Sequence, residues 1–237
     1  MRNSFKFTWA FSIAFLSFSS LALAQTADQI TDFTKAAKFD DVSEVKSLLK
    51  DGVSPNTLDP KGNPMLTVAI RDKSFKVADL LLSNPAIQVN LANKSGENPL
   101  MMAAFDGNLP FVRILVLDKK AAVNKPGWAP IHYAATNGHL QIVEFLMANG
   151  AQVNALSPSE TTPLMMAIGS GNELLIKYLL DNGADLSMRN HEGYTAIDIA
   201  QLFGKDDIRD GLKSRWQKLY KEPVSYTHLR AHETGRN

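Results

Sequence analysis

The 237-residue sequence contains no cysteine, so disulfide bonds cannot stabilise the fold even in an oxidising compartment. It also contains no P-loop, no GxSxG motif and no C-x-x-C pair, and its acidic residues form no paired-carboxylate pattern. It has no block of basic residues and a formal net charge of only +1, which gives no attraction for nucleic acid or an anionic membrane surface. We therefore predict no enzyme activity, no cofactor, no metal site and no nucleic-acid partner.

The first 24 residues are predicted to be a secretory signal peptide. Arg2 and Lys6 provide a short positive region, and a mostly apolar stretch follows it from Trp9 to Leu23. Small residues before the junction place the predicted cut after Ala24. The alternative is an uncleaved anchor, but the apolar stretch has about fifteen residues, against roughly 20 for a transmembrane helix. We therefore expect a periplasmic or secreted protein without a membrane segment after cleavage.

The last 14 residues differ in character from the rest of the chain. The stretch "VSYTHLRAHET", residues 224 to 234, resembles a sequencing adapter translated in one reading frame. We therefore treat residues 224–237 as a non-native tail and leave them out of the fold prediction. Without both ends, Lys and Arg fall to 21 and Asp and Glu to 23, so the body from residue 25 to residue 223 carries about −2. Its roughly 199 residues suffice to bury a hydrophobic core without disulfides.

The body of the chain repeats itself with a period of about 33 residues. The stretches "NPLMMAAFDGN", "APIHYAATNGH" and "TPLMMAIGSGN" share a proline, apolar residues, an alanine and a glycine-containing turn. A second, amphipathic stretch follows each of them, for example "VEFLMANGAQVN". The anchoring alanines have spacings of 33, 34, 31, 33 and 33, and they are Ala36, Ala69, Ala103, Ala134, Ala167 and Ala200.

Repeat four shows the residues that two short helices need, whereas the first repeat lacks the proline. Pro130 suits the first helical turn, where its missing N–H costs nothing. Ala134 is small enough for close approach of a neighbouring helix, and Gly138 ends the first helix. Gly150 supplies the left-handed turn that ends the second helix. A unit of this size cannot bury its own apolar stripe, so neighbouring units must stack.

These features resemble the ankyrin repeat family, and residues 126 to 154 lie close to its consensus. The resemblance covers about residues 28 to 212. It implies an all-α solenoid of about six helix-turn-helix repeats with short β-hairpin tips and a C-terminal capping helix at residues 206–222. The ankyrin repeat domain would span residues 25–223, with repeats at about 28–58, 59–92, 93–124, 125–156, 157–189 and 190–212.

Two irregularities depart from the family pattern. Repeats two and three each carry one extra residue, before Val89 and within "ILVLDKKA". The tip before Trp128 is three residues shorter than the equivalent tip of the following repeat. The hairpin geometry between repeats three and four is therefore an open question at this stage.

Three histidines lie in the body of the chain, and we interpret two of them as structural. In the ankyrin family, the residue that matches His132 forms hydrogen bonds between repeats. Gly138 separates His132 from His139, so the two do not share a helical face, and no third ligand is nearby in sequence for zinc. His191 lies in a hairpin tip, where it either contacts a partner or is simply solvated.

The resemblance implies a concave face built from the hairpin tips and the exposed side of the first helices. Exposed aromatic residues in polar surroundings are typical binding anchors. Trp128 could instead pack under its shortened tip, and Phe203 under the C-terminal helix. The predicted partner-binding residues are Arg71, Asp72, Glu97, Phe105, Asp106, Trp128, Thr136, Asn137, Tyr194 and Phe203.

The expected function is a non-catalytic protein–protein interaction module of the bacterial periplasm or secreted space. Its partner would be another protein, and the free chain is expected to be a monomer. Exported proteins that resemble this one suggest a role in stress defence or as an immunity protein. Two alternatives stay open: an envelope scaffold that acts by self-assembly, and the binding part of a truncated enzyme.

Overall fold

The computed structural model describes residues 25–221, so the signal peptide predicted for residues 1–24 and the tail predicted to be non-native at residues 224–237 lie outside the described residues. Twelve α-helices and one π-helical segment, η1, are present in this range. The inner helix of each pair is α1 (Ala27–Lys38), α3 (Met65–Arg71), α5 (Pro99–Phe105), α7 (Pro130–Thr136), α9 (Pro163–Ser170) or α11 (Ala196–Leu202). The outer helices are α2 (Val42–Lys50), α4 (Phe75–Ser83), α6 (Leu109–Arg113) with η1 (Ile114–Asp118), α8 (Leu140–Ala148), α10 (Glu173–Asp181) and α12 (Asp206–Tyr220).

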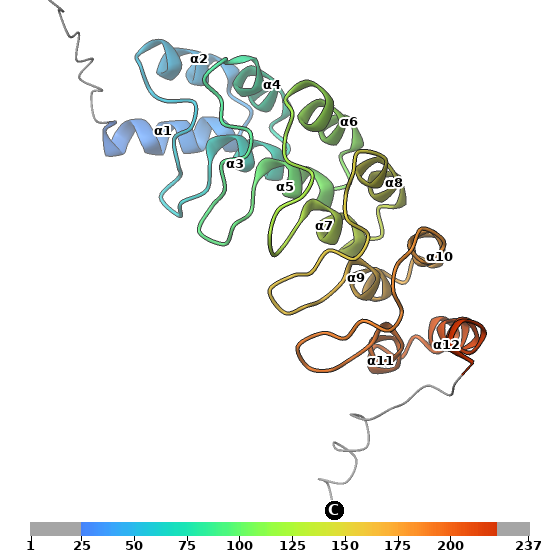
Figure 1. Cartoon of the computed structure of the whole chain (residues 1–237). Coiled ribbons are helices and arrows are strands. Elements are labelled where there is room, and N and C mark those ends of the chain that lie inside the picture. The colour runs from blue at the N-terminus through green and yellow to red at the C-terminus, as the bar shows by residue number, and fades with distance from the viewer. Residues whose placement is uncertain (1–24, 222–237) are drawn as a thin grey trace, which may run out of the picture.

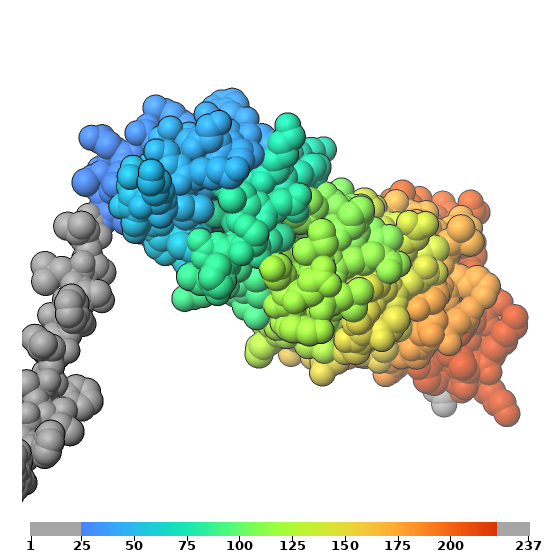
Figure 2. Space-filling model, turned by 90° about the horizontal axis from the view of Figure 1, so that it is seen from above, coloured from blue at the N-terminus to red at the C-terminus, as the bar shows by residue number. Residues whose placement is uncertain are grey.

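The helices form two parallel rows that together curve into an arc (Figure 1). Outer helices make one row, inner helices make the other, and long tips project beyond the inner row. In the space-filling view the colours follow one another in bands along the molecule, so each pair packs on the pairs next to it in sequence (Figure 2). The predicted all-α solenoid of stacked helical pairs is confirmed.

Three inner helices, α5, α7 and α9, begin at a proline, and in α5 and α9 the side chain of the preceding residue caps the helix. Pro99, Pro130 and Pro163 each occupy the first turn, where no backbone N–H is needed. The side chain of Thr162 caps α9 by accepting from the backbone N–H of Met165 at 3.3 Å. In the last pair Thr195 takes over this role, and its hydroxyl accepts from the N–H of Asp198 at 3.3 Å.

A glycine with positive φ turns the chain from inner to outer helix in the middle of the stack. Gly107 and Gly138 have φ of 74° and 72°. A Cβ built on Gly107 would lie 2.6 Å from Cε1 of His139 in the next repeat, so glycine is required for space as well as for conformation. The turn therefore also sets how closely repeats three and four approach.

The hydrophobic core is continuous from α1 to α12. The small alanines of the inner helices, such as Ala69, Ala103 and Ala134, are fully buried and let adjacent inner helices pack closely. Larger side chains from the outer row, such as Leu115 and Leu146, are fully buried beneath them. Burying one such leucine contributes about 1.5–3 kcal/mol, so the free energy of folding comes mainly from contacts between neighbours.

The extra residue of repeat three is absorbed inside its outer helix. After Arg113 the chain widens into η1, and the N–H of Lys119 donates to the carbonyl of Ile114 at 3.0 Å, five residues earlier. One residue inserted into an α-helix is commonly accommodated as such a π-bulge. Leu115 and Val116 stay buried, so the repeat keeps its core contacts.

The tips are closed loops with little β-structure. The backbone N–H groups of Asn93, Ser157 and Asn190 each donate to a carbonyl four residues later, at 2.9–3.1 Å. Residues 25–221 contain one isolated bridge, Leu58–Pro64, and no longer strand, so the tips are narrower than the expected β-hairpins. The shortened tip before Trp128 has no such closing bond among the described backbone hydrogen bonds.

The C-terminal helix is not a separate lid but the outer helix of the last pair. Its 15 residues make α12 longer than the nine-residue helices α8 and α10. Leu212 is buried, while the Trp216 and Tyr220 rings lie 4.4 Å apart between centroids. Arg215 ties the helix to α10 by donating to Asp181 Oδ1 at 2.8 Å and to the carbonyl of Leu180 at 2.9 Å.

Candidate functional site

An aromatic cavity of about 200 Å³ lies on the inner side of the stack, where repeats three, four and five meet. Phe105 at the end of α5 and Trp128 in the shortened tip contribute two of its rings, and α7 contributes the third ring, Tyr133. The remaining lining residues are His132, Thr136 and Met166. The cavity therefore combines side chains from three successive inner helices and one tip.

Phe105 and Trp128 each stand roughly at right angles to Tyr133. Phe105 and Tyr133 have ring centroids 6.2 Å apart with 74° between planes, and Trp128 and Tyr133 are 6.3 Å apart at 79°. Trp128 also meets the imidazole of His132 at 5.5 Å and 82°. Edge-to-face pairs of this kind contribute about 0.5–1.5 kcal/mol each beyond the area they bury. They hold the walls of the cavity in place.

A hydrogen bond orients the tyrosine wall. The hydroxyl of Tyr133 donates to Glu97 Oε1 at 3.1 Å, and the amide of Asn93 donates to Glu97 Oε2 at 2.8 Å. Burial and the negative charge of Glu97 raise the pKa of Tyr133 to about 12, because both disfavour the phenolate. Tyr133 is therefore a neutral donor at physiological pH.

His132 supports the cavity from beneath and is structural, as predicted. It is fully buried, and its Nδ1 accepts from the N–H of Ala129 at 3.1 Å. Nε2 therefore carries the proton and donates to the carbonyls of Ala155 at 3.0 Å and Thr161 at 3.2 Å, the second of which belongs to the next repeat. Burial lowers the pKa of His132, so the ring stays neutral.

His139 and Asn137 anchor the phenylalanine wall. His139 Nε2 lies 2.9 Å from the carbonyl of Phe105, and the Asn137 amide donates to the same carbonyl at 2.7 Å. Both bonds cross from repeat four to repeat three, so they fix the end of α5 relative to α7. Phe105 itself keeps 40% of its surface exposed, which leaves one side of its ring available.

The structure brings four of the predicted binding residues together. Phe105, Trp128 and Thr136 line the cavity, and Glu97 is one hydrogen bond away through Tyr133. Asp106, next to Phe105, is exposed at the end of α5, and burial of its carboxyl raises its pKa despite the nearby charges of Lys73, His139 and Arg71.

The other predicted residues lie elsewhere on the stack. Arg71 and Asp72 pair with each other at 3.3 Å at the exposed end of α3. Phe203, 58% exposed, packs its ring over Gly169, where a Cβ would lie 3.5 Å away. Tyr194 belongs to the last tip, so it does not line the cavity.

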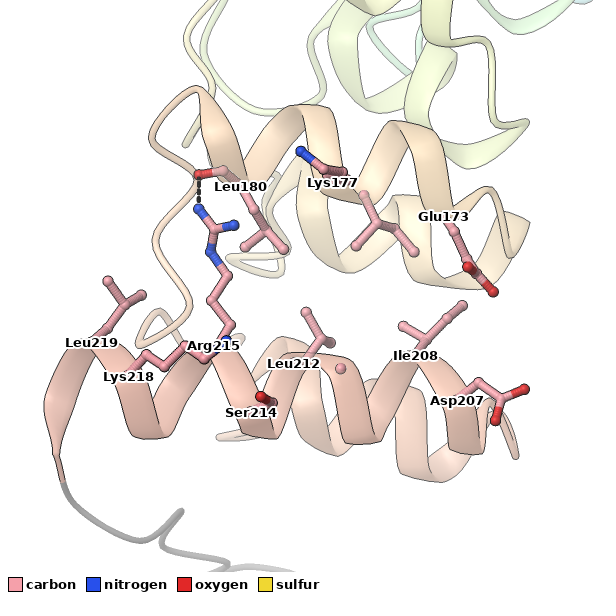
Figure 3. Close-up of a pocket in the computed structure, with 12 residues that line it drawn as sticks. Glu173, Lys177, Leu180, Asp207, Ile208, Leu212, Ser214, Arg215, Lys218 and Leu219 are labelled. Carbon is pink, nitrogen blue, oxygen red and sulfur yellow. Dashed lines mark hydrogen bonds between the residues drawn. The ribbon is translucent and has the colours of Figure 1, made fainter.

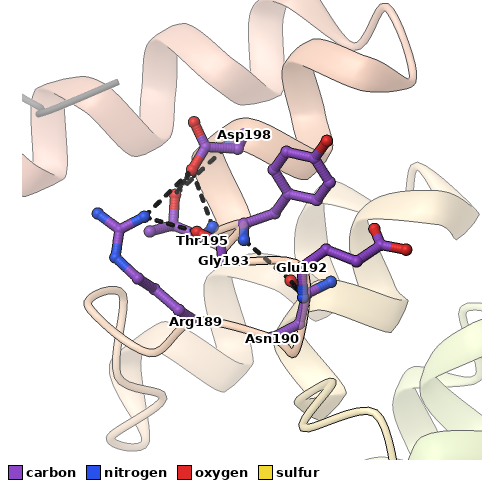
Figure 4. A network of polar contacts seen from close by, with 7 residues as sticks. Arg189, Asn190, Glu192, Gly193, Thr195 and Asp198 are labelled. Atoms are coloured by element: carbon purple, nitrogen blue, oxygen red, sulfur yellow. Dashed lines mark hydrogen bonds and ion pairs between the residues drawn. The ribbon is translucent and has the colours of Figure 1, made fainter. Parts of the chain in front are cut away.

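The last tip has its own polar network, which positions Tyr194 (Figure 4). Asn190 Oδ1 accepts from the backbone N–H groups of Glu192 and Tyr194 at 3.1 and 2.9 Å. Arg189 donates to the carbonyl of Gly193 at 2.7 Å and lies 3.9 Å from Asp198 Oδ2. The buried Asp198 occupies the position that His132 has in repeat four, so the terminal repeat uses a carboxylate where the central repeat uses an imidazole.

Sequence reasoning missed Tyr133 and Met166. Both precede an anchoring alanine, and the equivalent residues of other repeats are Val68, Met102 and Ile199. This position alternates between core and groove according to the size of its side chain, because the inner helix presents it at the boundary between the two. The informative signal was Tyr133 itself, because equivalent positions of other repeats hold aliphatic residues such as Val68 and Ile199.

A second hollow of about 460 Å³ lies between α10 and α12 (Figure 3). Its floor is aliphatic, with Leu180, Ile208 and Leu212 among the lining residues. Charged side chains line its rim: Glu173, Lys177, Asp207, Arg215 and Lys218. Of these, Lys177 and Arg215 already bind Asp181.

Within residues 25–221 no three His, Cys, Asp or Glu side chains come together as metal ligands. In the same range no helix is both long enough and apolar enough to cross a membrane.

Comparison with known proteins gives one consistent result. Residues 86–157 match the family "Ankyrin repeats (3 copies)", and residues 148–200 match "Ankyrin repeats (many copies)". The chain is 30% identical to the "Ankyrin repeat and SAM domain-containing protein 6" of Mus musculus over 175 residues. These residues are 72% of this chain but 16% of the mouse protein. It is 29% identical to the human "Transient receptor potential cation channel subfamily A member 1", over 64% of this chain and 14% of the channel. The chain thus spans a small part of these long relatives.

A bacterial relative has a similar length. The ankyrin repeat protein YahD of Escherichia coli (strain K12) is 28% identical over 185 residues, which cover 75% of this chain and 92% of YahD.

Proposed function

Because the chain belongs to the ankyrin repeat family, whose repeats are protein-interaction modules, we propose that it binds another protein on its concave face without catalysing a reaction. The observation that carries this proposal is the aromatic cavity between Phe105, Trp128 and Tyr133. Hot spots of protein interfaces are enriched in Trp and Tyr held in well-packed surroundings with a polar rim. The cavity and its neighbours Glu97, Asp106 and Asn137 have this composition.

The cavity is also pre-organised, which supports binding. Tyr133 is fixed by Glu97, Phe105 is fixed through its backbone carbonyl by Asn137, and Trp128 packs edge-on against His132. A surface whose side chains are already ordered loses little conformational entropy when a partner arrives. The free energy gained by burying a partner side chain in the cavity would therefore appear mostly as binding affinity.

We place this activity in the periplasm or the secreted space of a bacterium. The support is the signal-peptide pattern of the first 24 residues and the absence of cysteine from the sequence, which makes folding independent of redox conditions. Stress defence and neutralisation of a toxic effector are the two biological roles that we propose for such binding.

The test is capture of a partner by the full-length protein. The purified protein is immobilised, exposed to an envelope extract of its source cell and washed, and bound proteins are quantified against the bait. One partner at a stoichiometric ratio supports the proposal. A chain that captures nothing but copies of itself, and that sediments as an oligomer in analytical ultracentrifugation, would instead be a self-assembling scaffold.

A further inference from the structure

Within residues 25–221, no cation–π contact is made to the three cavity rings. Elsewhere the chain does cover an aromatic face with its own charge, because the guanidinium carbon of Arg113 lies 4.9 Å from the centroid of the Phe145 ring. Within the part of the chain that the structure describes, Phe105, Trp128 and Tyr133 have no such partner. Phe105 is exposed and Trp128 and Tyr133 are half-buried, so part of their aromatic surface can attract a ligand cation, which aromatic faces do at up to about 6 Å.

A negative charge lies directly behind this cavity. Glu97 is bonded to the Tyr133 hydroxyl at 3.1 Å and to the neutral Asn93 amide at 2.8 Å, and it forms no ion pair within residues 25–221. The Lys125 ammonium, on the shortened tip, donates to the carbonyl of Gly96 at 2.9 Å. The carboxylate of Glu97 is therefore not neutralised by a bonded cation, and it favours positive charge over neutral groups nearby.

The lining of the cavity selects among cations. Apart from the three rings, His132, Thr136 and Met166 line it. The Thr136 hydroxyl is already bonded to the carbonyl of His132 at 2.8 Å, and both ring nitrogens of His132 are bonded to the backbone. A primary ammonium would lose hydrogen bonds to water here without finding acceptors. A methylated ammonium carries few or no N–H groups and spreads its charge over methyl surfaces, so an apolar cavity with aromatic walls suits it better.

We propose that the cavity between Phe105, Trp128 and Tyr133 binds a methylated ammonium group, either on a small molecule such as choline or on a side chain of the protein partner. The rings supply the cation–π contacts, and Glu97 supplies the long-range attraction. The location rests on the proposed function, since the cavity lies on the same concave face. The preference for a methylated ammonium group does not rest on the proposed function, because a free ligand can occupy the cavity without a protein partner.

The first experiment compares two ligands of the same shape. The full-length protein is titrated calorimetrically with choline and with 3,3-dimethylbutan-1-ol, in which a neutral carbon replaces the charged nitrogen. The proposal predicts at least tenfold tighter binding of choline. Equal or tighter binding of the neutral alcohol would show an ordinary apolar pocket and overturn the proposal, as would no measurable binding of choline.

Variants separate the aromatic and the electrostatic contributions. Trp128→Leu keeps the cavity apolar but removes a π-face, so we expect choline affinity to fall at least tenfold and affinity for the alcohol to change little. Glu97→Gln keeps an acceptor for Tyr133 and should weaken choline binding severalfold without affecting the alcohol. Phe145→Leu, at the ring that Arg113 already covers, is the matched control and should change neither.

Phe105→Leu guards against a folding defect in the tryptophan variant, because Phe105 lies at the exposed end of a helix. Circular dichroism and thermal melting check the fold of each variant. A folded Phe105→Leu protein that binds choline as tightly as the unchanged protein would contradict the proposal even if Trp128→Leu could not be purified.

Two peptides test whether the methylated ammonium belongs to a protein partner or to a small molecule. One peptide carries trimethyl-lysine, and the other has the same sequence with unmodified lysine. Tighter binding of the trimethylated peptide than of free choline assigns the group to a protein partner, and tighter binding of choline assigns it to a small molecule. Discrimination against the unmodified peptide is expected in both cases, and equal binding of the two peptides would overturn the proposal. If the protein captures a partner but does not bind choline, the proposed function is supported and only this further inference is wrong.

Discussion

Two hollows of the stack can be compared, and they differ in how their walls are built. The central cavity lies beside the shortened tip of repeat four, which carries Trp128. Repeat four also has Tyr133 at a position where several other repeats have an aliphatic residue. The C-terminal groove lies between α10 and α12 (Figure 3), and Gly211, which has no side chain, is among its lining residues. The central walls are held by hydrogen bonds that involve Glu97, Asn137 and His139. The groove has an aliphatic floor, and its two helices are joined through Arg215. A large hollow at the end of a solenoid therefore says less about ligands than a small, fixed one in its middle.

The largest expected difference between the two regions is in stability. His132→Ala leaves the Ala129 N–H and the Ala155 carbonyl unpaired, removes one of the two bonds to the Thr161 carbonyl and opens a buried space, so we expect a loss of about 3–5 kcal/mol in the free energy of unfolding. Ile208→Ala in the partly exposed groove should cost about 1 kcal/mol. Urea titration measures the free energy of unfolding of both variants. Equal losses would mean that the contacts of His132 stabilise the fold no more than those of Ile208 in the C-terminal groove.

Glycine substitutions sharpen the same comparison. Gly107→Ala would force a positive φ on alanine and push a Cβ to 2.6 Å from the His139 ring, for an expected cost of about 2–3 kcal/mol. Gly183→Ala also requires positive φ, but nothing lies within 4 Å of its Cβ, so about 1 kcal/mol is expected. Thermal unfolding of both variants checks the order, and a larger loss for Gly183→Ala would contradict the tight contact between repeats three and four.

The pH dependence of stability should come from the central histidine. The pKa of His132 in the folded protein lies below its usual value of about 6.5, because the charged ring would be buried. Between these two pKa values the unfolded chain binds a proton that the folded protein does not, so stability is complete above about pH 7 and falls as the pH drops below 6.5.

We expect the free energy of unfolding to decrease by about 1 kcal/mol from pH 7.5 to pH 5.5, measured by urea titration at each pH. His132→Gln should remove this dependence, and His191→Gln, at an exposed tip, should keep it. A dependence that survives the His132 substitution would assign it to another group.

The smallest expected effect concerns the groove. Gly211 lies inside α12, and a Cβ there would meet nothing within 4 Å. Gly211→Ala should therefore raise the free energy of unfolding by about 0.5–1 kcal/mol, through helix propensity alone. Differential scanning calorimetry measures the shift, and a destabilised variant would show that the groove needs the glycine.

Much of the fold was predictable because it follows from a repeating pattern. The alanine spacing, the prolines of the inner helices and the glycine turns each require one local conformation, and the predicted role of His132 is confirmed by its bonds to Ala155 and Thr161. The π-helical segment after Arg113 was not predictable, because an extra residue can be absorbed in a helix or in a loop. The tips also form less β-structure than expected.

The candidate site was predictable only in part. The exposure of Phe105 follows from its place after the alanine pair, but the cavity also needs Tyr133 and Met166, whose direction depends on the rotation of each inner helix. The bond between Tyr133 and Glu97 joins residues 36 positions apart, and no local pattern indicates it. The binding role of the ten predicted residues stays a prediction.

The central claim is that a partner binds at the central cavity and not at the larger groove, and one competition of variants tests it most directly. Partner capture is quantified for the unchanged protein, for Trp128→Ala and for Ile208→Glu, which places a charge on the groove floor. We predict that Trp128→Ala weakens capture by about 2 kcal/mol or more, roughly 30-fold, while Ile208→Glu leaves it unchanged. Loss of capture in folded Ile208→Glu, with full capture by Trp128→Ala, would contradict the account.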